Sequence, residues 1–92
     1  QKIVRAKKSE IALLKNHCPE QILERSPLYK REPVSLKRAL EEPNQEGIIA
    51  EFKRRSPSRG WINQGADPVE IGLGYLQAGV TALSILTDHQ YF

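Results

Sequence analysis

The chain has 92 residues, of which 39% are hydrophobic and 27% charged, and its formal net charge is +3. A chain this short buries only about 60–65% of its unfolded surface, so the sequence predicts a thin core and either one small domain or a piece of a larger one. The single cysteine, Cys18, excludes an intramolecular disulfide. No apolar run approaches the roughly 20 residues of a membrane span, and the charged start does not resemble a signal peptide, so we expect a cytoplasmic location.

Residues 1–46 are predicted to be mainly helical. Apolar residues recur at helical spacing over residues 2–17, and Pro19 both ends that helix and can open a short second one. A third helix is expected at residues 36–42, with Ser35 as its N-terminal cap. These residues are too generic for a site prediction.

Residues 47–92 are predicted to form strand, loop, helix and strand in that order. Residues 47–53 read as an apolar strand, and residues 80–86 are apolar on both faces, which is typical of a parallel strand covered on both sides. Between them, residues 54–66 are expected to be a long irregular loop, and loops of that length tend to be functional. This βαβ order is expected at the start of either an eight-stranded βα barrel or a doubly wound sheet. The loop lacks the Gly-x-Gly-x-x-Gly pattern of a dinucleotide site.

The helix between the two strands has a clear start and a clear stop. Asp67 is expected to cap it, Pro68 takes the first helical position, and Gly79 ends it after residue 78. Gly72 and Gly74 inside it each cost about 1 kcal/mol relative to alanine. Close packing against a strand is the expected reason for both glycines.

Two opposite charges, Glu51 and Lys53, stand at the end of the first predicted strand. Strand side chains alternate with period two, so both should point the same way, opposite to Phe52. In a βα barrel this end of a strand faces the active site, where a lysine can bind a carboxylate or transfer a proton and a glutamate can orient it. A plain salt bridge on an exposed strand is the alternative explanation.

The loop that follows combines hydroxyl and basic side chains. Ser56 and Ser58 offer hydroxyls to an anionic oxygen, and Pro57 stiffens the turn, although an ordinary turn would use the same residues. Three arginines share the loop and are expected to steer an anionic substrate or to face solvent: Arg54, Arg55 and Arg59.

The run Ile-Ile-Ala-Glu-Phe-Lys-Arg-Arg-Ser-Pro-Ser-Arg-Gly, residues 48–60, resembles the first barrel strand and following loop of indole-3-glycerol-phosphate synthases. Residues 83–88, Leu-Ser-Ile-Leu-Thr-Asp, resemble the second strand. The resemblance is most specific over residues 47–92. Residues 1–46 match that family's N-terminal extension only in their general helical character. It implies an α/β fold, in which the extension precedes the first βαβ unit of a TIM (β/α)8 barrel, so that the barrel is incomplete.

The resemblance also implies a function. Members of the family are lyases of tryptophan biosynthesis. They close the indole ring of 1-(2-carboxyphenylamino)-1-deoxyribulose 5-phosphate with loss of carbon dioxide and water. The resemblance implies no cofactor and no metal. It assigns catalysis to Glu51 and Lys53. It assigns substrate contacts to four further residues: Ser56, Pro57, Ser58 and Phe92. The family's acid lysine, a catalytic glutamate and the phosphate site belong to later strands that this sequence does not contain.

By this interpretation the 92-residue chain is inactive alone, and its uncovered strands lead it to self-associate. The partner is a small anionic substrate rather than nucleic acid or a membrane. The alternative is a small basic module whose arginines bind phosphates or nucleic acid, but the chain has no recognised nucleic-acid motif. Another βα-barrel enzyme acting on sugar phosphates is a third possibility.

Overall fold

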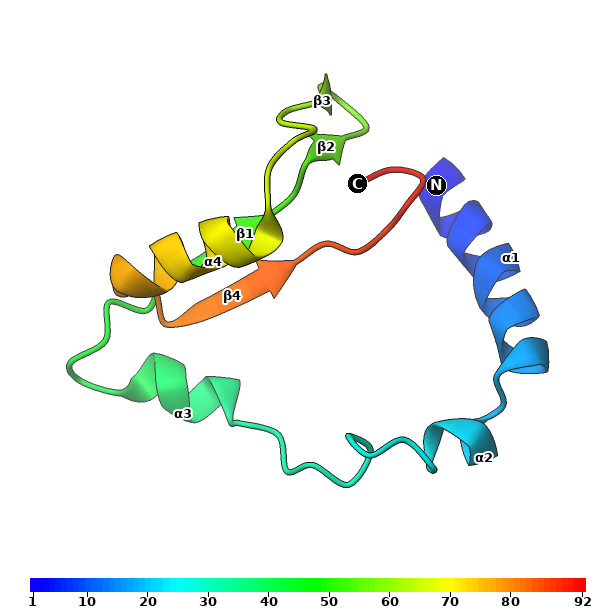
Figure 1. The fold of residues 1–92 in the computed structure, drawn as a ribbon, viewed down its shortest axis with the longest axis horizontal. Coiled ribbons are helices and arrows are strands. Elements are labelled where there is room, and N and C mark those ends of the chain that lie inside the picture. The colour runs from blue at the N-terminus through cyan, green and yellow to red at the C-terminus, as the bar shows by residue number, and fades with distance from the viewer. The chain divides into compact units, whose positions relative to one another are not determined.

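A computed structural model describes all 92 residues, which divide into two compact units, Gln1–Val34 and Ser35–Phe92 (Figure 1). Each unit is described by itself. The third helix belongs to the second unit, together with the strands. The division at residues 46 and 47, drawn from family resemblance, stays a prediction.

The first unit contains the two helices expected from the sequence, α1 (Lys2–His17) and α2 (Glu20–Leu23). At the end of α1, the Cys18 N–H donates to the carbonyl oxygen of Leu14 at 2.7 Å, and Pro19 then breaks the helical path. Neither helix buries any of its residues. None of the helices in the chain combines the length and the apolar character that crossing a membrane requires.

The second unit begins with α3 (Leu36–Glu41), one residue shorter than expected. Ser35 caps it as predicted, because its Oγ accepts a hydrogen bond from the Arg38 N–H at 3.2 Å. The chain then turns through Gly47, whose φ of +69° is readily adopted only by glycine.

Two short parallel strands form the centre of the second unit. They are β1 (Ile49–Phe52) and β4 (Ala82–Ile85), each shorter than the predicted strand, and Glu51 lies opposite Ser84 in their register. The chain therefore mixes helix and strand around a small parallel sheet, and its strands do not close into a barrel.

Helix α4 (Pro68–Gln77) connects the two strands and lies along them (Figure 1). Its start is as predicted, because Asp67 Oδ1 accepts a hydrogen bond from the Val69 N–H at 3.0 Å. The helix ends at Gln77, one residue before the expected end, and Gly79 follows with a φ of +89° as the predicted stop.

The two glycines inside α4 differ from each other. A Cβ on Gly72 would lie 3.1 Å from Leu83 Cδ2, so close packing against β4 explains this glycine. A Cβ on Gly74 would meet nothing within 4 Å, so the packing explanation is wrong for Gly74.

The two faces of the β1–β4 pair have different surroundings. Leu83 packs toward α4, and Phe52, on the same face by register and alternation, is the only buried hydrophobic residue, at 5% exposure. The opposite face carries Glu51 and Ser84 and is open. Residues 80–86 were expected to be covered on both sides, but within this chain α4 covers one side only, and even there Ile85, the register partner of Phe52, stays 47% exposed.

The loop after β1 is more regular than the sequence suggested. It contains a small antiparallel hairpin of β2 (Arg55–Ser56) and β3 (Gly60–Trp61). The Arg54 carbonyl oxygen closes its base by accepting from the N–H groups of Ile62 at 2.7 Å and Asn63 at 3.1 Å. The expectation of an irregular loop over residues 54–66 was wrong, because these backbone pairings have no signature in side-chain periodicity.

Candidate functional site

The ends of β1 and β4 bring two separate chain segments together. Parallel strands finish at the same edge of a sheet, so the β2–β3 hairpin after β1 and residues 86–92 after β4 leave from one edge (Figure 1). The Leu86 N–H donates to the Phe52 carbonyl oxygen at 3.1 Å, which extends the pairing into this exit. Every predicted site residue lies on β1, directly after it, or on one of these two exit segments.

Glu51 and Lys53 lie together, as their alternation predicted. Lys53 Nζ is 3.9 Å from Glu51 Oε1, and their side chains are 40% and 45% exposed. Ser84 of β4 donates a hydrogen bond from Oγ to Glu51 Oε2 at 3.4 Å. The three side chains share the face that α4 leaves open.

This arrangement leaves capacity for a ligand. An ion pair at 3.9 Å and half exposure is loose, so the ammonium group retains donors that can reach another anion. Sequence reasoning did not single out Ser84. Its signal was available as one of two hydroxyl residues, with Thr81, in the mostly apolar segment 80–86, but its contact with Glu51 depends on the register of β1 and β4.

Ser56 is the most buried of the predicted contact residues, at 9% exposure. Its Oγ accepts a hydrogen bond from the Arg59 N–H at 3.2 Å and lies 3.3 Å from Ser58 Oγ. The two hydroxyls therefore brace the hairpin turn around Pro57. Ser58 and Pro57 are exposed at the turn. Their contact with substrate stays a prediction.

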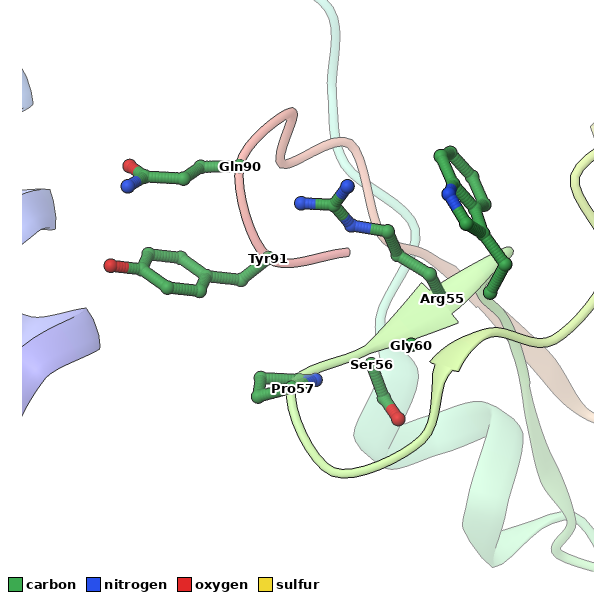
Figure 2. Close-up of a pocket in the computed structure, with 7 residues that line it drawn as sticks. Arg55, Ser56, Pro57, Gly60, Gln90 and Tyr91 are labelled. Atoms are coloured by element: carbon green, nitrogen blue, oxygen red, sulfur yellow. The ribbon is translucent and has the colours of Figure 1, made fainter.

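A hollow of about 330 Å³ lies between the hairpin and the segment after β4 (Figure 2). The hairpin lines it with Arg55, Ser56, Pro57 and Trp61, and the exit segment lines it with Gln90 and Tyr91.

Arg55 is the only charged residue that lines this hollow. Its guanidinium carbon lies 5.2 Å from the centroid of the Trp61 ring, and the two residues are cross-strand partners in the hairpin. Figure 2 shows the Gln90 and Tyr91 side chains pointing away from this guanidinium. Sequence reasoning did not single out Trp61, because its place beside Arg55 depends on the hairpin register.

Phe92 lies apart from the other predicted contacts. It lines a second hollow of about 230 Å³ with Phe52, Arg54 and Pro68, and neither Glu51 nor Ser56 lines it. The segment is held by Asp88, whose Oδ2 accepts from the N–H groups of Tyr91 and Phe92. The structure thus joins Glu51 with Lys53, and Ser56 with Pro57 and Ser58, but places Phe92 with neither group.

Comparison with known proteins places this sequence in a family. The sequence profile described as "Indole-3-glycerol phosphate synthase" matches residues 1–92, the whole chain. The chain belongs to the indole-3-glycerol phosphate synthase family. This confirms the resemblance seen in residues 48–60 and extends it over residues 1–46.

Individual members of the indole-3-glycerol phosphate synthase family agree. The chain is 64% identical over 58 residues, 63% of its length, to the indole-3-glycerol phosphate synthase of Bacteroides thetaiotaomicron, and covers 22% of that protein. It is 43% identical over 91 residues, 98% of its length, to that of Halalkalibacterium halodurans, and covers 32% of it. It is 41% identical over 93 aligned positions, all of its length, to that of Geobacillus sp. WCH70, and covers 33% of it. The chain thus spans about a third or less of these family members.

Proposed function

We propose that the protein to which these residues belong is an indole-3-glycerol phosphate synthase, a lyase of tryptophan biosynthesis built on a TIM barrel. The observation that supports it most directly is the Glu51–Lys53 pair with Ser84 at the carboxyl end of a parallel strand pair. In a TIM barrel the active site lies at that end of the strands. The small parallel sheet with α4 as its connection fits the start of such a barrel.

The proposed substrate is 1-(2-carboxyphenylamino)-1-deoxyribulose 5-phosphate. The ring carbon that carries the carboxylate forms a bond to the sugar's keto carbon, the carboxylate leaves as carbon dioxide, and the former keto oxygen leaves as water. Lys53 has unused donors for a carboxylate oxygen or for proton transfer. Glu51 lies 3.9 Å away and can orient that ammonium or stabilise positive charge that develops on the substrate nitrogen. Ser84 steadies the glutamate through its hydrogen bond.

The loop residues complete the proposed site. Ser56, Pro57, Ser58 and Phe92 are proposed to contact the substrate, with the hairpin closing over its aromatic end. The 92 residues by themselves are proposed not to complete the reaction, because they supply one parallel strand pair and span about a third of the relatives in the family. A small anionic substrate and a step of amino-acid synthesis are consistent with a cytoplasmic location, which fractionation of cells would test.

The test uses the complete natural polypeptide that contains these residues. We expect it to convert the substrate to indole glycerol phosphate, measured by the fluorescence of the indole product. Glu51→Gln and Lys53→Met, each close in size to the native residue, should lower kcat about a hundredfold or more, the range for removing a group that takes part in proton transfer.

Matched controls make the same chemical changes outside the site. Glu70→Gln alters an exposed residue in the first turn of α4, and Lys37→Met alters an exposed residue of α3. Both should keep kcat within about twofold, as surface changes usually do. An unmodified polypeptide that forms no product, or full activity in both site variants, would refute the proposal.

No observation in the structure specifically favours the alternative function, a nucleic-acid-binding module. Its signature would be binding of DNA or RNA that weakens steeply with salt. Such binding by the complete polypeptide, without turnover of the substrate, would favour that alternative.

A further inference from the structure

We propose that Asp88 is a positioning residue, which fixes the backbone that carries Phe92 and so acts on substrate binding through the Phe92 ring. The inference rests on the proposed function, in which Phe92 contacts the substrate. It is carried by two hydrogen bonds between the Asp88 carboxylate and the backbone of the exit segment after β4.

Backbone pairing in the second unit ends just after β4. The Leu86 N–H donates to the Phe52 carbonyl oxygen, and residues 87–92 form no further backbone–backbone hydrogen bond within this unit. The path of such a segment depends on its side chains, because few backbone hydrogen bonds mean low local stability. Asp88 is the only residue of the second unit whose side chain hydrogen-bonds the backbone of this segment.

One oxygen atom of Asp88 holds two successive residues. Its Oδ2 accepts a hydrogen bond from the Tyr91 N–H and another from the Phe92 N–H, the latter at 3.2 Å. Hydrogen bonds from N–H groups to a carboxylate are stronger than those to a neutral oxygen. Because the two donors are adjacent along the chain, turning the backbone of Phe92 away from Asp88 would break a bond. The backbone at Phe92 is therefore fixed, and its ring is restricted to a few rotamers.

The location of Asp88 connects these bonds to the proposed site. Asp88 and Phe92 are both half-buried and line the same hollow of about 230 Å³, at the edge of the sheet where β1 and β4 end. A side chain that is held in place before a ligand arrives loses less entropy on binding. Asp88 is thus expected to strengthen substrate binding while making no contact with the reacting atoms.

The experiment measures KM and kcat of the complete natural polypeptide, together with ligand binding by calorimetry. The binding probe is 1-(2-carboxyphenylamino)-1-deoxyribitol 5-phosphate, in which the substrate's keto group is reduced to an alcohol so that the ring cannot close. In Asp88→Ala the dissociation constant for this analogue and the KM should each rise about tenfold, the order expected when charge-assisted hydrogen bonds are lost. The kcat should change less than about threefold. Asp88→Asn, which keeps an oxygen acceptor, should recover most of the loss.

Two comparisons separate positioning of Phe92 from general stabilisation. In a Phe92→Leu background, Asp88→Ala should weaken analogue binding by less than about a further twofold, because the ring that Asp88 positions is already absent. Asp67→Ala removes another aspartate that accepts a backbone N–H, at the start of α4, and should leave the dissociation constant within about twofold. Amide hydrogen exchange at Tyr91 and Phe92 should become faster in Asp88→Ala and stay unchanged in Asp67→Ala.

The outcomes are distinct. The role of Asp88 would be overturned by an undiminished effect of Asp88→Ala in the Phe92→Leu background, by equal losses in Asp88→Asn and Asp88→Ala, or by unchanged amide exchange in Asp88→Ala. An unmodified polypeptide that binds the analogue without turning over the substrate would refute the proposed function alone, because the binding measurement does not require turnover. An unmodified polypeptide that does not bind the analogue would overturn both.

Discussion

Glu51 and Lys53 show how single residues prepare this chain for chemistry. Their charges stand on the open face of β1, where neither is buried, so the pair contributes little to folding. Phe52, which lies between them in sequence, contributes to folding instead, because it is the chain's one buried hydrophobic residue. Alternation along a strand lets one short segment supply both a core residue and two residues of the candidate site.

The N-terminal cap of α4 gives a prediction at the residue scale. Asp67→Ala removes the acceptor for the Val69 N–H and should lower the free energy of unfolding by about 1 kcal/mol. Asp67→Asn keeps an oxygen acceptor and serves as the control. The two variants are compared by chemical denaturation of the complete natural polypeptide, and equal stability of both would contradict the role of the cap.

A second residue, Thr81, links the chain segments that precede the two parallel strands. Its Oγ1 accepts from the Gly47 N–H at 3.2 Å and faces Gln45 Oε1 at 3.5 Å, so it links residues 34 and 36 positions apart. Thr81→Val keeps the shape and should cost about 0.5–1.5 kcal/mol of unfolding free energy, measured by denaturation. Thr87→Val, at a threonine that makes no side-chain hydrogen bond, should cost less, and the reverse order would count against the link.

At the element scale, α4 explains why the two strands pair. Its N-terminal cap, the proline at its first position and Gly79 fix where it begins and ends, and Gly72 lets it approach Leu83. The β2–β3 hairpin is organised differently. It depends on the Arg54 carbonyl oxygen, the Ser56 hydroxyl and the contact of Arg55 with the Trp61 ring, which stays 54% exposed.

The glycines of α4 provide the element-scale prediction. Gly74→Ala should raise the unfolding free energy by about 0.5–1 kcal/mol, because a Cβ meets nothing there and alanine favours the helix. Gly79→Ala should lower it by about 1–2 kcal/mol, because a residue with a Cβ is strained at a φ of +89°.

Gly72→Ala is the informative third variant. Its Cβ would lie 3.1 Å from Leu83 Cδ2, so its stability should fall below that of Gly74→Ala. All three are measured by thermal unfolding of the complete natural polypeptide. Stabilisation by Gly79→Ala, or Gly72→Ala more stable than Gly74→Ala, would contradict this account of the helix.

At the scale of the whole molecule, apolar surface exceeds what the chain covers. Phe52 is its only buried hydrophobic residue, while Ile49 on β1 and Leu14 on α1 are about half exposed, at 52% and 53%. A single parallel strand pair also leaves both of its outer edges without hydrogen-bond partners. Such surfaces are typical of interfaces with further structure.

The isolated 92-residue chain is therefore predicted to self-associate. Sedimentation should show a mass that rises with concentration, and Ile49→Lys, on the open face of β1, should reduce it. Val34→Lys introduces the same charge at a residue that is 84% exposed at the end of the first unit and should have a smaller effect. A monodisperse monomer that unfolds cooperatively would contradict the prediction.

What the sequence determined by itself was local. Periodicity and capping residues located α1, α3 and α4, and alternation correctly put Glu51 and Lys53 on one face, because each of these features depends on neighbours a few residues away. Family resemblance in residues 48–60 pointed to the family that the comparison established.

Only the tertiary structure decided which distant residues meet. Ser84 reaches Glu51 through the register of two strands that are 33 residues apart, and Trp61 reaches Arg55 through a hairpin of two-residue strands. It also separated Phe92 from the other predicted contacts. Strand register and loop hydrogen bonds are set by the sum of many weak long-range contacts, and no local pattern of residue types specifies that sum.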